Sequence, residues 1–172
     1  IQIIYDEPKC FNSMMAHYGK FDSVNNYIAL VREKSKPDEA LGYYGEQIVL
    51  KAQELGLNTC WVAMTHGKSK AQIDKGEKLV CLISLGYGKT AGAAHKSKKL
   101  SEVCNYKKDM PEWFLSGMEA ALLAPTAMNR QKFYFELLPD NSIKITCGKG
   151  LYTKLDLGIV KYHFEVVSGK RI

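Results

Sequence analysis

An apolar stretch that reads as a helix meets a stretch that reads as a strand in the second half of the chain. Pro125 fixes its own φ and has no N–H group, so a helix over residues 114–123 is expected to end near Ala124. A strand is expected over residues 133–138. The polar residues 125–131, called the corner below, must therefore turn the chain between two regular elements.

Three side chains of the corner carry hydrogen-bonding groups: the Thr126 hydroxyl and the carboxamides of Asn129 and Gln131. A carboxamide offers both donors and acceptors. This set suits a planar heterocycle with acceptors and a donor along one edge, such as the pyrimidine end of a flavin. The same groups could instead satisfy backbone groups at an ordinary turn, and composition alone favours that simpler interpretation.

Periodicity divides the rest of the chain into expected strands and helices. The clearest helix covers residues 41–55, where apolar residues recur at helical spacing and Gly56 follows as a C-cap. The sequence DMPE predicts a helix start at residues 109–112, with a capping acid and a proline in the first turn. Further helices are expected over residues 68–74 and 155–167, a loop over 32–39, and strands over 1–5, 27–31, 59–64, 78–86 and 142–146.

Glycines eleven residues apart bracket both long helices, Gly45 and Gly56 the first and Gly158 and Gly169 the last. The residues between them match only in apolar character. The pattern indicates an architecture of two halves and leaves open whether the chain is an internal duplication.

Length and composition indicate one globular domain over residues 1–172. Hydrophobic residues make up 46% and charged residues 24%, which is ordinary for such a protein. No apolar run approaches a membrane span and no signal peptide is visible, so a cytoplasmic protein with no membrane association is expected. The chain begins at Ile1, without Met, inside an expected strand, which suggests that an N-terminal segment is missing.

The net charge of +6 is compatible with a phosphate-bearing ligand. The lysines are scattered and hardly alternate with aromatic residues, so no nucleic-acid partner is expected. The five cysteines are odd in number and form no C-x-x-C, which predicts free thiols. Cys60 and Cys81 lie in apolar runs and are expected to be buried.

Other motifs give no support to other chemistries. The sequence GYGKT at residues 86–90 imitates a phosphate loop, but Ile83 stands where the first glycine is required, and no acidic partner for a dinucleotide fold follows. The four histidines show no metal spacing, and His163 is expected to be a hydrogen-bonded structural residue. No G-x-S-x-G elbow surrounds a serine.

Two blocks resemble FMN-dependent nitroreductases. Residues 124–131, APTAMNRQ, resemble the family signature A-P-S-x-x-N-x-Q-P-W, with Thr126 for its Ser and Lys132-Phe133 for its Pro-Trp. Residues 55–61, LGLNTCW, resemble its L-G-L-G-T-C-W segment, with Asn58 for a Gly. The order of the blocks is similar to that in the Thermotoga-type subfamily of single-chain, pseudo-dimeric nitroreductases, and the likeness runs from about residue 42 to residue 169.

The resemblance implies an α+β fold in which helices flank a mostly antiparallel central sheet. It implies FMN as cofactor and NAD(P)H as co-substrate, with a nitroaromatic or quinone as the small-molecule electron acceptor, in a monomer or homodimer. The flavin supplies the redox chemistry, so no side chain is predicted to act as a catalytic acid or base. A flavin-free or ligand-binding relative on the same scaffold is the alternative.

The resemblance also implies which residues hold the cofactor. In the corner they are Thr126, Asn129 and Gln131, with Pro125 shaping the turn. After the second block, main-chain amides in the family approach the flavin near N5 and O4, where a donor stabilises the charge that builds on reduction. The matching positions are Val62, Ala63 and Met64.

The family's N-terminal Arg-Arg-Ser-x-Arg, which binds the FMN phosphate, has no counterpart in residues 1–26. Either that segment precedes Ile1, or lysines such as Lys149 or Lys154 take its place, or the cofactor is not held.

Overall fold

The computed structural model describes residues 1–90 and 92–172, and the chain forms two compact units. The first unit comprises Ile1–Pro37 and Gln47–Gly92, and the second comprises Asp38–Glu46 and Ala93–Ile172. Helix α2 (Glu39–Glu54) contributes its first half to the second unit and its second half to the first. Ala91 lies outside the described residues.

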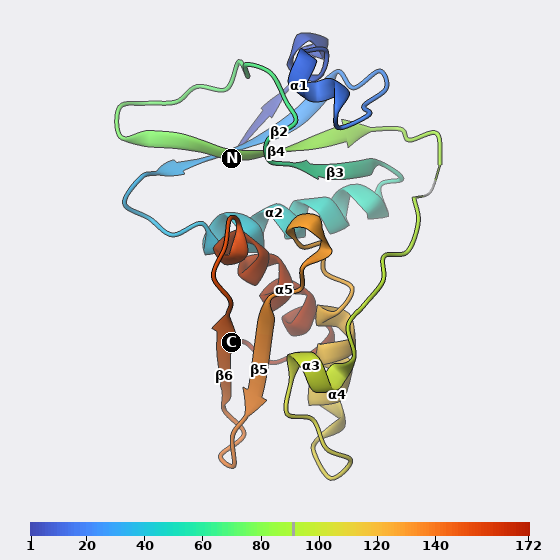
Figure 1. Ribbon diagram of the computed structural model, residues 1–172, viewed down its shortest axis with the longest axis vertical. Coiled ribbons are helices and arrows are strands. Elements are labelled where there is room, and N and C mark those ends of the chain that lie inside the picture. Colours follow the sequence, from blue (N-terminus) through green and yellow to red (C-terminus); the bar gives the residue numbers. More distant parts are fainter. Residues whose placement is uncertain (91) are drawn as a thin grey trace. The chain divides into compact units, whose positions relative to one another are not determined.

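An antiparallel four-stranded sheet forms the first unit. Its strands lie in the order β1 (Gln2–Ile4), β2 (Asn26–Glu33), β4 (Glu77–Gly86) and β3 (Asn58–Val62), so β1 and β3 are the edges. A short 3-10 helix, η1 (Pro8–Phe11), and helix α1 (Met14–His17) precede β2. Figure 1 shows α1 on one face of this sheet and the second half of α2 on the other.

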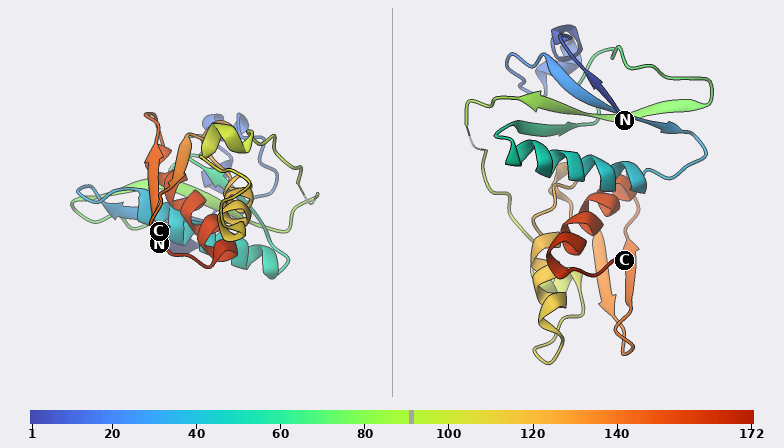
Figure 2. Two further views of the ribbon diagram at one scale, coloured as in Figure 1. Left: turned by 90° about the horizontal axis from the view of Figure 1, so that it is seen from below. Right: turned by 180° about the vertical axis from the view of Figure 1, so that it is seen from behind.

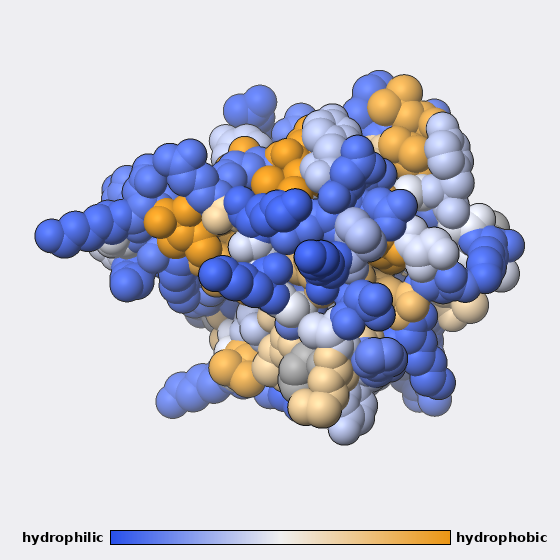
Figure 3. Space-filling model, turned by 90° about the horizontal axis from the view of Figure 1, so that it is seen from above, coloured by the Kyte–Doolittle hydropathy of each residue, from blue (hydrophilic) through white to orange (hydrophobic). Residues whose placement is uncertain are grey.

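Both faces of the central strands are buried, which explains why β2 and β4 read as continuous apolar runs. On one face Tyr27, Ala29 and Leu82 pack with Cys10 and Phe11 from η1. The alternate residues of the same strands face the other way and are buried as well, among them Ile28, Leu30 and Ile83. Seen from above in Figure 3, the surface over the sheet is mainly hydrophilic, with apolar side chains in small separate groups.

The second unit packs helices around a two-stranded hairpin. The hairpin pairs β5 (Phe133–Leu137) with β6 (Ile143–Cys147), and Figure 2 shows α4 (Glu112–Ala121) and α5 (Thr153–Ser168) beside it. Phe164 of α5 joins these elements, because its ring contacts those of Phe114 and Phe135 at centroid distances of 6.2 and 5.2 Å. Helix α3 (Leu100–Val103) and a 3-10 turn, η2 (Ala127–Asn129), complete the unit.

The first half of α2 crosses α5 at two glycines. A Cβ atom on Gly42 would lie 1.9 Å from the carbonyl oxygen of Leu155, and one on Gly158 would lie 1.9 Å from that of Glu39. His163 donates or accepts a hydrogen bond with the buried Glu46 at 2.8 Å across the same pair of helices, which confirms its predicted structural role. The close contact thus uses Gly42, not the Gly45 of the proposed repeat, and the duplication itself stays a prediction.

Most expected elements are confirmed with small shifts of their ends. Gly56 and Gly169 end the two long helices in the left-handed conformation, at φ 78° and 67°. The expected loop over residues 32–39 is shorter, because β2 extends to Glu33 and α2 begins at Glu39. Helix α4 ends at Ala121, three residues earlier than expected, and Pro111 is its N-cap in place of Asp109.

The helix expected over residues 68–74 is wrong, since this segment has no regular secondary structure. Its backbone is bound elsewhere: the Lys70 amide donates to the Glu7 carboxylate at 3.1 Å and to the Tyr27 hydroxyl at 3.2 Å. The Tyr27 hydroxyl also lies 2.7 Å from Ser69 Oγ and donates to Glu7. Partners distant in sequence have replaced the local helical hydrogen bonds.

All five cysteines are free, but only part of the burial prediction holds. Cys81 is buried in the central strand β4, whereas Cys60 is exposed because it lies on the edge strand β3. An apolar sequence neighbourhood does not distinguish a central strand from an edge strand.

Candidate functional site

Three residues of the corner adopt left-handed backbone conformations: Met128, Asn129 and Gln131, at φ 53°, 52° and 47°. Thr126 holds this shape, since its carbonyl accepts from the Asn129 amide at 2.8 Å and its hydroxyl from the Gln131 amide at 3.0 Å. Left-handed backbone is costly for residues other than glycine and is often found at functional sites.

Two backbone donors of the corner have no protein partner in the part of the chain that the structure describes. The amides of Thr126 and Met128 donate no hydrogen bond within the described residues, whereas the Ala127 amide between them donates to Asp156. Met128 is exposed and Thr126 is half-buried, so a ligand can reach this turn.

The two carboxamides of the corner bind a neighbouring segment of main chain. Asn129 Nδ2 and Gln131 Nε2 both donate to the carbonyl oxygen of Lys96 at 2.8 Å, and Gln131 Nε2 also donates to Asn129 Oδ1 at 2.6 Å. Gln131 Oε1 accepts from the Lys98 amide at 2.8 Å. Gln131 is buried with both amide hydrogens committed, whereas the exposed Asn129 keeps one N–H and one oxygen lone pair.

The segment 95–98 lies along the corner and the end of α4. His95 Nε2 lies 3.2 Å from the carbonyl oxygen of Leu123, and Ser97 Oγ donates to that of Leu122 at 3.2 Å. Every residue of the segment therefore makes a hydrogen bond to residues 122–131, although it contains no helix or strand.

Asp156 supports the corner from the first turn of α5. Its Oδ1 accepts from the Ala127 amide at 2.9 Å, and the side chain is almost fully buried. Burial raises the pKa of this carboxyl from its usual 3.8 to about 6, against the smaller, opposite effect of the Ala127 hydrogen bond.

We expect Asp156→Asn to stabilise the protein above pH 6 and to change little at pH 4. The folded state binds the proton more tightly than the unfolded state, so the free energy of unfolding falls as pH rises from about 4 to about 6. Asparagine keeps the acceptor and removes the buried charge, which predicts a gain of about 1–2 kcal/mol at pH 8. Urea unfolding of both proteins at pH 4 and pH 8 measures it, and an equal difference at both values would contradict the explanation.

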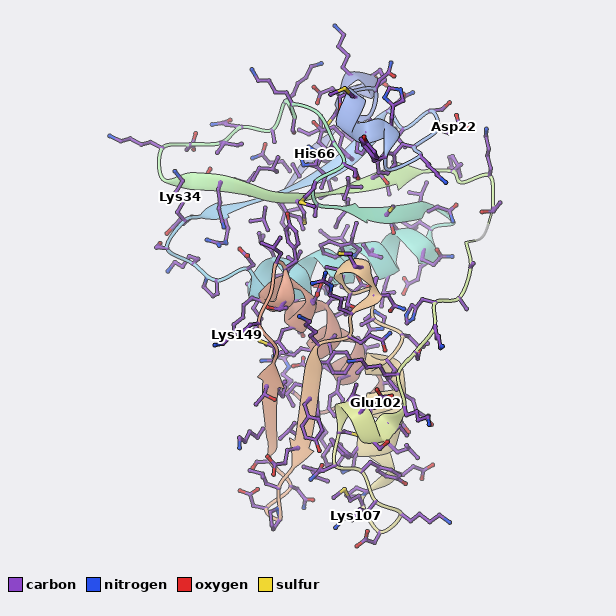
Figure 4. The ribbon with its side chains drawn as sticks, viewed as in Figure 1. Asp22, Lys34, His66, Glu102, Lys107 and Lys149 are labelled. Atoms are coloured by element: carbon purple, nitrogen blue, oxygen red, sulfur yellow. The ribbon has the colours of Figure 1, made fainter. Side chains whose placement is uncertain are left out.

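The positions after the second block, residues 62–64, lie at the end of β3 in the first unit. Val62 is its last residue and is buried, while Ala63 and Met64 begin the irregular stretch that leads to β4. The amides of Ala63 and Met64 donate no hydrogen bond within the part of the chain that the structure describes. Figure 4 labels His66 farther along this stretch, which Glu7 and Tyr27 anchor at Lys70.

An open cavity of about 320 Å³ lies beside the start of β3 and the end of β4 in the first unit. Asn58, Cys60 and Ser84 line it together with residues 86–89, and an exposed ion pair between Lys89 and Asp22 lies at its edge. Figure 4 labels Asp22. The Gly88 amide donates to Asn58 Oδ1 at 2.8 Å, so this turn is tied to the sheet and does not open a helix as a phosphate loop would.

A family model described as "Putative TM nitroreductase" matches residues 1–168. The chain belongs to this nitroreductase family. A crystal structure of a putative nitroreductase from Thermotoga maritima has the same fold, with a TM-score of 0.67 at 24% identity. The match covers 83% of this chain and 60% of that one, so the chain spans less than two thirds of the relative's length. No curated protein sequence matches significantly.

Nitroreductase membership and the likeness of fold agree with the α+β architecture expected from the sequence. The residues that the resemblance assigns to the cofactor fall in different units: Thr126, Asn129 and Gln131 are adjacent in the second, and residues 62–64 lie in the first. Sequence reasoning missed Asp156 and Lys96, because no local signal links either to a turn some thirty residues away.

The donors of this nitroreductase chain fit the heterocyclic part of a flavin. The carbonyl oxygens of a flavin accept hydrogen bonds, and the corner carries two amides, those of Thr126 and Met128, without a protein partner among the described residues. Lys149 and Lys154 lie near the start of α5, and Figure 4 labels Lys149 in the loop before it. Within the described residues, no group of three or more His, Cys, Asp or Glu could hold a metal. None of the helices in that part of the chain has the length and apolar character that a membrane span requires.

Proposed function

We propose that this protein is an FMN-dependent NAD(P)H oxidoreductase that reduces small acceptors such as nitroaromatics or quinones. The observation that carries the proposal is the pair of amides in the corner, those of Thr126 and Met128, that donate no hydrogen bond within the described residues. When bound, the flavin supplies the hydride and electron transfer.

The chain's own groups bind and orient the ring. The Thr126 and Met128 amides and the spare N–H of Asn129 donate towards carbonyl oxygens of the ring, while Gln131 acts on the corner and not on the ring. Pro125 keeps α4 from continuing through the turn.

A flavin-free relative is the second candidate, favoured by the commitment of both Gln131 amide hydrogens to protein acceptors. The two candidates differ in one measurement. An oxidoreductase should show flavin absorbance on purification or on titration with FMN, and FMN should raise its melting temperature. No absorbance change and no thermal shift at saturating FMN would favour the flavin-free relative.

Replacing Asn129 with Leu should weaken FMN binding by about 1–3 kcal/mol, because the ring then loses a polar partner in the corner. Fluorescence titration of FMN gives the dissociation constants. Met128→Leu is the matched control, since that side chain is exposed and the substitution leaves the backbone amide in place. Equal affinities of the Asn129→Leu variant and the wild type would remove Asn129 from the site.

A further inference from the structure

The segment 95–98 alternates its side chains between two sides of the chain. His95 and Ser97 reach carbonyl oxygens at the end of α4, whereas Lys98 Nζ donates to the carbonyl oxygen of Gln131 at 3.0 Å. The Lys96 oxygen and the Lys98 amide both bind the Gln131 carboxamide, as neighbouring groups on one edge of an extended chain do. Residues i and i+2 of an extended chain share a face, so we expect the Lys96 side chain on the same side of the chain as that of Lys98.

The charge of Lys96 is not neutralised. Its side chain is exposed and makes no ion pair or hydrogen bond within residues 1–90 and 92–172. The same is true of the neighbouring Arg130. The buried carboxylate of Asp156 accepts a hydrogen bond from the Ala127 amide and makes no ion pair with Lys96 within the described residues. Within the described residues, a fixed main chain therefore carries a cation without an ion-pair partner, beside the turn whose Thr126 and Met128 amides donate no hydrogen bond.

We propose that Lys96 binds the negative charge of the flavin, and that Gln131 is the residue that positions it. This rests on the proposed function. The charge can be the phosphate of FMN or the ring after reduction, and an ammonium on a four-carbon stem suits either as a point charge. Gln131 acts through the main chain: its carboxamide fixes the Lys96 oxygen and the Lys98 amide together.

The test compares Lys96→Gln with Lys99→Gln, which removes the same positive charge three residues farther along the chain. Lys99 is exposed at the start of α3, and neither carboxamide of the corner binds it. Dissociation constants for FMN and riboflavin are measured by fluorescence at low and high salt. We expect Lys96→Gln to weaken FMN binding about tenfold at low salt and less at high salt, because a solvent-exposed charge is screened.

Riboflavin, which lacks the phosphate, distinguishes the two sources of charge. Loss for FMN alone assigns Lys96 to the phosphate. Unchanged binding of both oxidised flavins with a lowered reduction potential of bound FMN assigns Lys96 to the reduced ring. Unchanged affinities and potential, or an equal loss in Lys99→Gln, would overturn the proposal. If wild-type protein binds neither flavin, the proposed function fails first.

A double-mutant cycle tests the role of Gln131. If Gln131→Leu acts by releasing Lys96, its loss of FMN affinity and that of Lys96→Gln will not add in the double variant. Ser97→Ala provides a milder change, since it removes the bond to Leu122 on the opposite side and leaves Gln131 intact. It should also reduce the effect of Lys96→Gln. Fully additive losses in both cycles would show that the segment does not position Lys96.

Discussion

Gly158→Ala should lower the free energy of unfolding by about 3 kcal/mol or more, although alanine is the better helix former by about 1 kcal/mol. The added Cβ would lie 1.9 Å from the carbonyl oxygen of Glu39 and 2.6 Å from the amide nitrogen of Tyr43. Both are backbone atoms of α2, so no side chain can rotate away. The helices must separate, and that breaks the contacts on either side of the crossing.

Those contacts are the hydrogen bond from the Tyr43 hydroxyl to Glu165 at 2.7 Å and the pair of His163 with Glu46 at 2.8 Å. For a chain of this size, a loss of about 3 kcal/mol lowers the melting temperature by roughly 6–12 °C. Differential scanning calorimetry measures it. Gly86→Ala is the control, because a Cβ there meets nothing within 4 Å and should change stability by about 0.5 kcal/mol or less. A melting temperature of Gly158→Ala equal to that of the wild type would show that α2 and α5 do not cross here.

Tyr27→Phe should destabilise the first unit by about 2–4 kcal/mol, since it leaves a buried carboxylate without its main donor. The Tyr27 hydroxyl lies in the core and donates to Glu7, which is itself almost fully buried. Burial, and then the Glu7 carboxylate, raise the pKa of Tyr27 far above its usual value, so the hydroxyl remains a donor throughout the physiological range. Among the described residues, the Lys70 amide would then be the one donor left to the Glu7 carboxylate.

Urea unfolding measures the loss, with Tyr5→Phe as the matched control. Tyr5 follows β1 in the same unit, but its side chain is exposed and makes no hydrogen bond within the described residues. Hydrogen exchange adds a local readout: the Lys70 amide should exchange faster in Tyr27→Phe at a denaturant concentration far below the transition. Equal stability of the two variants would mean that Glu7 is satisfied without Tyr27.

Local patterns in the sequence predicted the elements whose stabilisation is local. The helix over residues 41–55 appears as α2 because its apolar spacing and its C-cap glycine lie within the element itself. The hairpin of β5 and β6 follows from two short apolar runs around the turn at residues 139–141. Pro125 excludes a helix that continues through the corner, whatever α4 packs against, because no tertiary contact can restore the N–H group that proline lacks.

Only the tertiary structure decided what the corner's side chains do. The sequence placed Asn129 and Gln131 in one turn and left open whether they serve a ligand or the backbone. Their partners, Lys96 and Lys98, lie more than thirty residues away, and no local pattern identifies such a contact. The chain by itself thus determined where the backbone must bend and which family it resembles, because φ preferences and periodicity act over a few residues. Three features depended on atoms that meet only after folding. They are the acceptors of the Gln131 amide hydrogens, the glycines at the crossing of α2 and α5, and the bonds that keep residues 68–74 from forming a helix.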